Sequence, residues 1–181
     1  MTQLTIYHED TPALPLARLS QPDAISAALA VIGVDFSQWP LAAALPADAD
    51  SATVLHAYAP QIAALQAERG YTTVDVVRLT PAHPERAALR QKFLSEHTHA
   101  EDEVRFFVEG SGTFYLHAQQ RVYRLHCQQG DLLSVPAGAR HWFDTGTEPL
   151  FTAIRLFIDP AGWVGHITGD TIAARFIPDA A

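Results

Sequence analysis

The sequence predicts a mainly β protein, with helices and short strands from its N-terminal half packed around a barrel. The first observation is that short β-rich runs alternate with turn residues after residue 97, for example at Gly110-Ser111-Gly112 and Pro136-Ala137-Gly138. Several short strands at such spacing are typical of an all-β sandwich or barrel. The second is that helical runs and β-branched runs are mixed before that point. We therefore expect one β barrel with an α/β addition.

The N-terminal half is expected to hold three helices. Ser20 is expected to cap the first, with Pro22 early in its first turn and Gly33 stopping it. The second is expected to bend before Pro60 and to end at Gly70. The expected helices cover residues 23–32, 50–69 and 84–94, and the expected strands cover 4–7, 34–36 and 72–79. The Ala-rich residues 41–52 are expected to form a loop that leads into the second helix.

The C-terminal half is expected to consist almost entirely of strands, because its apolar and β-branched runs are short and bounded by Gly and Pro. The expected strands are 104–108, 113–117, 121–127, 132–135, 141–143 and 151–158, separated by breaks at 110–112, 129–131, 136–138 and 146.

The length of 181 residues is enough for a single domain with a sizeable core. Its 48% hydrophobic and 18% charged residues are typical of a globular chain rather than a disordered one. We expect one domain, 1–181, with a mixed α/β part at 1–95, a barrel core at 96–160 and a C-terminal extension at 161–181.

Charge and cysteine content exclude several classes of function. The chain has 20 acidic against 12 basic residues, a net charge of -8, which argues against a nucleic-acid partner because such sites need clustered Lys and Arg. Cys127 is the only cysteine, so neither an intrachain disulfide nor a thiolate zinc cluster can form. The first ten residues do not resemble a signal peptide, and no apolar run reaches the ~20 residues of a membrane helix. We expect a cytoplasmic protein with no membrane partner.

Three histidines and one glutamate form a pattern that is typical of a metal site. His97 and His99 lie two residues apart, so on a strand both imidazoles face the same way. Glu103 follows at an even offset, and His141 follows a Pro-x-Gly turn further along the chain. Three neutral imidazoles and one carboxylate suit a divalent transition metal. On an octahedral ion they would leave two positions open for substrate.

The spacing of these residues resembles the two motifs of the cupin superfamily, whose fold is a double-stranded β-helix, or jelly-roll-like barrel. The first motif corresponds to His97-x-His99-x-x-x-Glu103 followed by Gly110, and the second to residues 130–141. Two positions depart from the pattern: Gln91 replaces a Gly and Thr145 replaces an Asn. Neither is a ligand position, so the departures concern the subfamily more than the site.

The two longer runs 96–112 and 130–144 resemble the acireductone dioxygenase family of methionine salvage, and the similarity extends over nearly the whole chain. The resemblance implies cleavage of the enediol ketone 1,2-dihydroxy-5-(methylthio)pent-1-en-3-one with O2. It implies one Fe2+ or Ni2+ per chain: iron would give 4-methylthio-2-oxobutanoate and formate, whereas nickel would give 3-(methylthio)propanoate, formate and CO. The family precedent implies a monomer. By position, Glu96 and Asp102 would assist metal incorporation or relay conformational change.

Arg105 is the expected catalytic residue. It lies two residues after Glu103, so both side chains are expected to point into the barrel. A buried cation is costly unless it meets an anion, and a deprotonated enediol is such an anion. The resemblance likewise implies that Arg105 helps to generate the substrate dianion. The alternative is that Arg105 pairs with a structural carboxylate such as Glu109 or Asp102.

Aromatic residues near the motifs could form a dry wall for the methylthio group: Phe93, Trp142 and Phe143. Barrel core is an equally good interpretation of each. Five other histidines have no such frame and are interpreted as surface or core residues, namely His8, His56, His83, His117 and His126. The roles of His166 and Trp163 stay open. Two other functions also remain: a different cupin dioxygenase or isomerase, and a non-enzymatic cupin that binds a small ligand.

Overall fold

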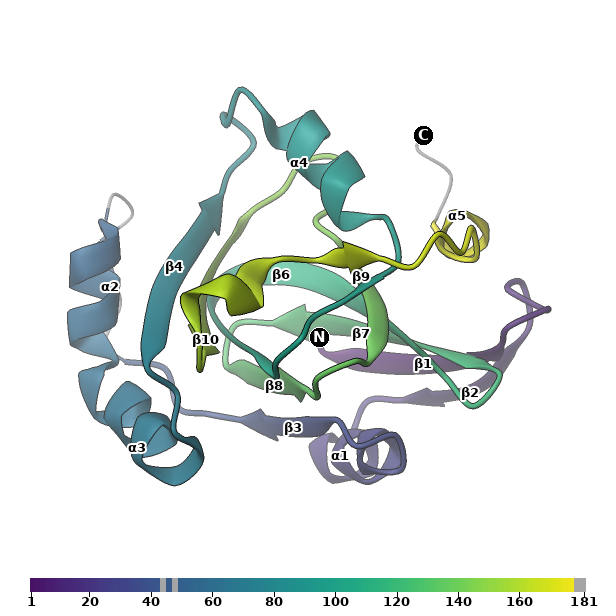
Figure 1. Cartoon of the computed structure of the whole chain (residues 1–181), viewed down its shortest axis with the longest axis horizontal. Helices are drawn as coiled ribbons and strands as arrows, with labels where there is room; N and C mark the ends of the chain where they lie inside the picture. Colours follow the sequence, from purple (N-terminus) through teal and green to yellow (C-terminus); the bar gives the residue numbers. More distant parts are fainter. Residues whose placement is uncertain (43–44, 47–48, 178–181) are drawn as a thin grey trace.

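The computed structural model describes residues 1–42, 45–46 and 49–177. Its eleven strands form one continuous sheet that curls into a barrel, and the helices lie around the outside of it (Figure 1). The fold is mainly β and has the cupin architecture, as the sequence predicts. Among the described residues, no helix has the length and apolar character that crossing a bilayer requires.

The N-terminal half supplies four strands and four helices. In chain order they are β1 (Gln3–His8), β2 (Pro15–Leu19), α1 (Pro22–Ala30), β3 (Asp35–Gln38), α2 (Ser51–Ala57), α3 (Ala59–Arg69), β4 (Thr73–Leu79) and α4 (Arg86–Phe93). The expected bend before Pro60 is confirmed, because α2 and α3 are separate helices that meet at Tyr58. Gly70 ends α3 in a left-handed conformation, φ 76°, which glycine adopts without steric cost.

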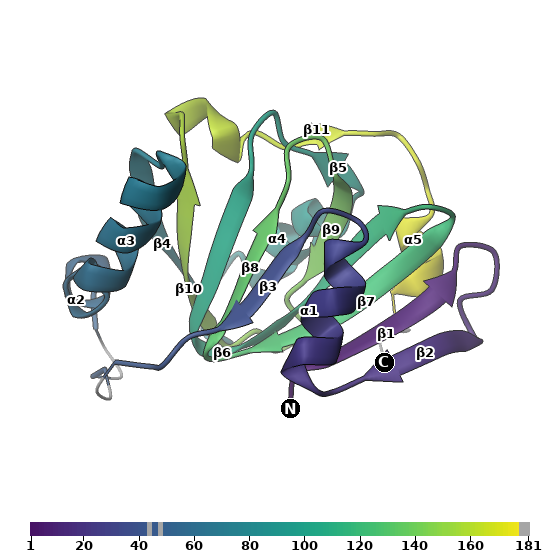
Figure 2. The same cartoon turned by 90° about the horizontal axis from the view of Figure 1, so that it is seen from below.

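The C-terminal half supplies the rest of the barrel. Its elements are β5 (His97–Thr98), β6 (Glu103–Ala118), β7 (Arg121–Gln128), β8 (Asp131–Val135), β9 (Arg140–Asp144), β10 (Phe151–Phe157), η1 (Pro160–Trp163), β11 (His166–Ile167) and α5 (Ala173–Phe176). Figure 2 shows β11 lying beside β5 at one end of the barrel.

Strand β6 joins the two faces of the barrel. Its first part pairs with β8 and β10, and its second part pairs with β7 and β9. One face therefore has the order β4-β10-β6-β8-β3, and the other has the order β2-β1-β7-β6-β9-β5-β11. The strand turns from one face to the other at Gly110, where φ is +68° and the backbone of Leu150 approaches so closely that a Cβ would lie 1.8 Å from its carbonyl oxygen.

Alternation along the strands separates the barrel interior from its outer surface. Phe107, Phe114, Leu133 and Phe143 belong to the central apolar cluster. Val104, Phe106 and Val108 lie on the opposite face of β6 and pack with residues of α2 and α3. Since buried apolar area contributes ~25 cal/mol per Å2, this two-sided burial explains why β6 is rich in large apolar residues.

Several local expectations are wrong in detail. Gln21, not Ser20, occupies the N-cap of α1, and no side chain caps that helix. The expected break at 110–112 does not end a strand, because Gly110 bends β6 without interrupting its pairing. The sequence also gave no indication of β2, η1, β11 and α5. Of the expected loop at 41–52, residues 43–44 and 47–48 lie outside the described part of the chain, and residues 51–52 belong to α2.

Candidate metal centre

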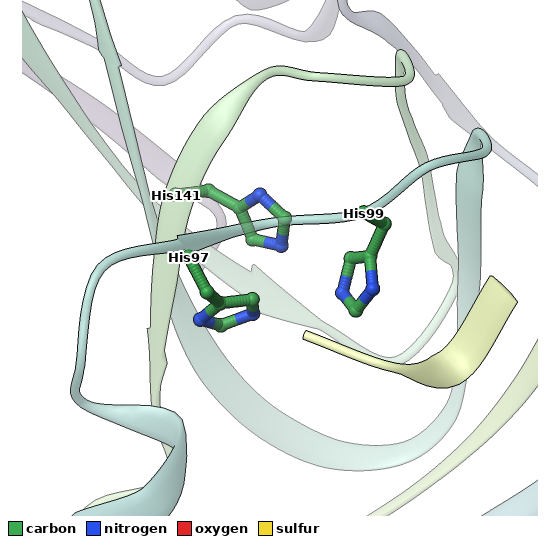
Figure 3. A group of neighbouring side chains, drawn as sticks. All are labelled: His97, His99 and His141. Atoms are coloured by element: carbon green, nitrogen blue, oxygen red, sulfur yellow. The ribbon is translucent and has the colours of Figure 1, made fainter. Parts of the chain in front are cut away.

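Three imidazoles converge at one end of the barrel. His97 lies on β5 and is paired with His141 on β9, while His99 follows β5 directly. One ring nitrogen of each lies within 4.8 Å of the others. The rings point toward one another in Figure 3, with centroid separations of 4.5, 5.2 and 5.3 Å. Pairing of β5 with β9 therefore brings together residues more than forty positions apart.

The Nδ1 atom of each imidazole is bonded to a backbone carbonyl oxygen. The acceptors are Ser95 for His97 at 2.7 Å, Val164 for His99 at 3.1 Å and Ala139 for His141 at 2.9 Å. A carbonyl oxygen can only accept, so each Nδ1 donates and each neutral ring keeps the electron pair on Nε2. Metal-ligating histidines are held in this way by a second partner.

Electrostatics favour a neutral imidazole at His97. Burial lowers its pKa to about 4, and the neighbouring His141 acts in the same direction. A buried imidazolium would have lost its hydration, which is why the charged form is disfavoured. At neutral pH, His97 is therefore uncharged and able to donate its electron pair to a cation.

Glu103 stands at the side of this cluster as a buried carboxylate. Its Oε2 lies 3.1 Å from His141 Nε2 and 3.5 Å from His99 Nε2. Burial alone would raise its pKa, but the Arg105 guanidinium and the close approach of the two histidines outweigh burial and hold the pKa well below its usual range. Glu103 is therefore ionised, and its negative charge faces the imidazoles.

Arg105 occupies the barrel interior beside Glu103, as strand alternation predicts. Its Nη2 donates to Glu103 Oε1, so it pairs with neither Glu109 nor Asp102. Its guanidinium carbon lies 4.6 Å from the centroid of the Phe143 ring and 4.9 Å from that of Phe114. Among the described residues, its buried Nε has no hydrogen-bond partner. This side chain therefore retains a buried N–H donor near the cluster.

Phe93 and Phe143 lie on the interior side, whereas Trp142 does not. Phe93, on α4, packs against the central cluster with its ring 6.4 Å from that of Phe143. Trp142 points out of the barrel between its inward neighbours, where it stacks on Tyr115 at 5.1 Å and contacts Phe176 of α5. Trp142 therefore lies on the other side of β9 from His141 and Phe143, because adjacent residues of a strand face opposite sides.

Glu96 and Asp102 lie on either side of the segment that carries His97 and His99, and the side chains of both form hydrogen bonds. Asp102 Oδ1 accepts from the backbone N–H of Ala137 at 2.9 Å, which ties the loop before β6 to the turn before β9. Glu96 is fully buried, and its carboxylate contacts His117 Nδ1 and Thr168 Oγ1, both at 2.7 Å. These partners fix the chain on both sides of His97 and His99.

Two other histidines, His117 and His166, differ in burial and in their contacts. His117 is buried between two carboxylates, a role that its sequence context did not indicate because its partners Glu9 and Glu96 are 108 and 21 residues away. His166 is exposed and pairs with Thr98 through β11. The side chain of Trp163 is outside the part of the chain that the structure describes.

The donor set fits a divalent transition metal. Three imidazoles, each with Nδ1 hydrogen-bonded to a backbone carbonyl, offer Nε2 atoms toward one point, and an ionised carboxylate adjoins two of them. Imidazole nitrogen and carboxylate oxygen together suit iron, nickel, copper or zinc. Arg105, Phe114 and Phe143 lie on the interior side of the cluster, so the donor set adjoins one cation and apolar rings.

Comparison with known proteins identifies the family of this chain. The model of the ARD/ARD' family matches residues 4–165. The chain belongs to the ARD/ARD' family. Curated relatives cover 97% of the chain: an acireductone dioxygenase from Granulibacter bethesdensis is 56% identical over 98% of its own length, and one from Pseudomonas aeruginosa is 53% identical over 97%.

A solved structure of the same kind agrees with the fold. Acireductone dioxygenase from Bacillus anthracis, with a cadmium ion in its active center, superposes with a TM-score of 0.78. The two sequences are 32% identical, and the match covers 91% of this chain and 97% of that one. The ARD/ARD' match also contains all the expected ligands and Arg105, whereas β11 and α5 lie beyond its last residue.

Proposed function

We propose that this chain is a metal-dependent acireductone dioxygenase that cleaves 1,2-dihydroxy-5-(methylthio)pent-1-en-3-one with O2 in methionine salvage. The observation that carries the proposal is the convergence of three imidazoles, each with Nδ1 held by a backbone carbonyl, beside an ionised Glu103 and a buried Arg105. Full-length similarity to proteins named acireductone dioxygenase supports the choice of substrate.

The proposed ligands are His97, His99, Glu103 and His141, holding one Fe2+ or Ni2+ per chain. Such an ion, when bound, supplies Lewis acidity that favours deprotonation of substrate oxygens. Three imidazoles and a carboxylate accept either metal, so the products depend on loading. The iron form is expected to give 4-methylthio-2-oxobutanoate and formate, and the nickel form 3-(methylthio)propanoate, formate and CO.

Arg105 is the proposed catalytic residue. A fixed guanidinium in a buried site stabilises negative charge without reorganisation at the moment of reaction. The Nε donor of Arg105 and its pairing with Glu103 set it beside the position where a dianionic enediolate would bind. Phe93 and Phe143 provide apolar surface for the methylthio end, and they exclude water from the reacting carbons.

Further parts of the proposal concern the state of the protein in the cell. We propose a monomer that acts in the cytoplasm on a small molecule and O2, without nucleic-acid or membrane partners. The buried, reduced Cys127 and the excess of acidic residues are compatible with that setting.

Product analysis tests the proposed function directly. The protein is stripped of metal, reloaded separately with iron and nickel, mixed anaerobically with the acireductone and then exposed to air. Oxygen uptake with formate from both forms, and CO from the nickel form alone, is expected. Absence of oxygen uptake by both forms would reject this function and favour a different cupin enzyme or a ligand-binding cupin.

Elemental analysis tests the ligand set. Alanine variants of His97, His99 and His141 should each lose most of the bound metal while keeping a folded barrel, measured by circular dichroism. Full metal content in all three variants would contradict the assignment.

A further inference from the structure

A C-terminal strap, residues 158–170, runs alongside the segment that carries His97 and His99, where its strand β11 lies next to β5 (Figure 2). Its strand β11 pairs with β5, so Ile167 lies opposite His97. The carbonyl of Val164 accepts the bond from His99 Nδ1 at 3.1 Å. Gly165 lies against the other ring, because a Cβ at this position would be 3.2 Å from His97 Cδ2. The strap therefore fixes the orientation of two of the three imidazoles.

Two carboxylates fasten the strap at its ends. Glu101 Oε2 accepts from the backbone N–H groups of Ile158 at 3.0 Å and Asp159 at 2.8 Å. At the other end, Glu96 binds Thr168 twice: its carbonyl oxygen accepts from Thr168 N at 3.1 Å, and its Oε1 accepts from Thr168 Oγ1 at 2.7 Å. The strap is thus attached to Glu96, immediately before His97, and to Glu101, two residues after His99.

His117 in turn holds Glu96. Its Nδ1 lies 2.7 Å from Glu96 Oε2, and its Nε2 lies 2.9 Å from Glu9 Oε2. The Glu96 side chain is completely buried and that of His117 is 3% exposed. A buried carboxylate is costly unless hydrogen bonds compensate it, so the conformation of Glu96 depends on these partners.

We propose that His117 is a positioning residue for the metal centre: it fixes Glu96, Glu96 fastens Thr168, and the strap thereby keeps the Val164 carbonyl on His99. The inference rests on the metal centre proposed above and adds to it a path of contacts that leads away from the ligands. Partners that hydrogen-bond a metal-ligating histidine directly typically change metal affinity about 10- to 100-fold when they are removed, and the Val164 carbonyl at the end of this path is such a partner of His99.

A second cation site at the same place is the competing explanation. Ligand atoms of Glu96, His117 and Asp170 lie within 4.8 Å of one another. Both ring nitrogens of His117 already lie within 2.9 Å of carboxylate oxygens, however, so the contacts of the ring are accounted for without an ion. The positioning role therefore accounts for the contacts better.

The experiment measures how fast the nickel-loaded protein gives up its metal to a chromogenic chelator. Thr168→Val removes one hydroxyl and keeps the shape of the side chain. Its matched control is Thr2→Val, which removes an equally short bond, 2.7 Å to Asp131 Oδ2, elsewhere in the fold. We expect release at least about 10-fold faster in Thr168→Val and an unchanged rate in the control.

Two variants of His117 separate its two contacts. The amide nitrogen of Asn can replace Nδ1 and keep the bond to Glu96, whereas that of Gln can replace Nε2 and keep only the bond to Glu9. We therefore expect His117→Asn to retain nickel longer than His117→Gln. Amide hydrogen exchange at Thr168 should be faster in His117→Gln than in His117→Asn, because the Thr168 N–H donates to the Glu96 carbonyl.

The outcomes distinguish this inference from the proposed function. Wild-type release and exchange rates in Thr168→Val would overturn the positioning role even if His117 variants failed to fold. Two nickel ions per wild-type chain, one of them lost in His117→Asn, would overturn it in favour of a second cation site. A wild-type protein that retains no nickel would instead refute the metal centre itself.

Discussion

Replacement of Arg105 separates a catalytic role from a structural one. Its side chain is 11% exposed, pairs with the 3% exposed Glu103 and lies between two phenylalanine rings. Losing a buried, charge-assisted contact typically costs about 2–5 kcal/mol. Applied to the transition state, that loss slows turnover by roughly 30-fold or more, at about 1.4 kcal/mol per factor of ten.

Arg105→Ala should nevertheless keep its metal. Glu103 retains its contacts with His99 and His141, so the donor set stays in place. Arg105→Lys should recover part of the activity, since the charge is kept while the planar fork is lost. Arg105→Met is the matched control for packing, because it preserves length but removes the charge.

The assay combines three measurements on each variant: metal per chain, absorbance of the anaerobically bound substrate, and oxygen uptake after admission of air. Arg105→Ala and Arg105→Met should show normal metal, a weaker spectral shift toward the dianion and a large fall in kcat/KM. Normal turnover in Arg105→Ala, or loss of its metal, would refute the reasoning and make the residue structural.

Three other tests address the bend, the pocket and the metal. Gly110→Ala should lower the free energy of unfolding by several kcal/mol, since its Cβ would meet the Leu150 carbonyl; Gly138→Ala, with φ +75° and open space around it, should cost only about 1–2 kcal/mol in urea denaturation. Phe93→Ala should raise KM for the acireductone, whereas Trp142→Phe should leave KM unchanged; equal effects would argue against an interior site for the methylthio end. Removal of the metal with a chelator should lower Tm. Free nickel at 1,000 times its Kd should then raise the free energy of unfolding by about 4 kcal/mol.

The sequence predicted the barrel because Gly and Pro residues mark the turns between its short strands. It did not predict how β6 continues through residues 110–112, since glycine marks a bend and a strand end alike. Strand β2 escaped prediction because it begins with Pro15 and is an edge strand with little burial. The strap was not predicted, because its strand β11 has only two residues and such a short strand shows no periodicity in the sequence.

The candidate site was predictable where spacing alone decides geometry. His97, His99 and His141 do converge, and alternation correctly placed Arg105 beside Glu103. The same rule, applied to β9, would have turned Trp142 away from His141. The environment of His117 could not be predicted, because its partners are supplied by distant segments that only the folded barrel brings together.

The bonds to the three imidazole Nδ1 atoms come from main-chain oxygens rather than side chains. The residues that supply them, Ser95, Ala139 and Val164, are therefore free to vary in chemical type without loss of the acceptor. What must be inherited is the path of the backbone: two short turns and the course of residues 158–170. In such a centre the residue types specify the ligands, while the backbone conformation specifies their orientation. A count of identical residues therefore underestimates how much of the site related chains share.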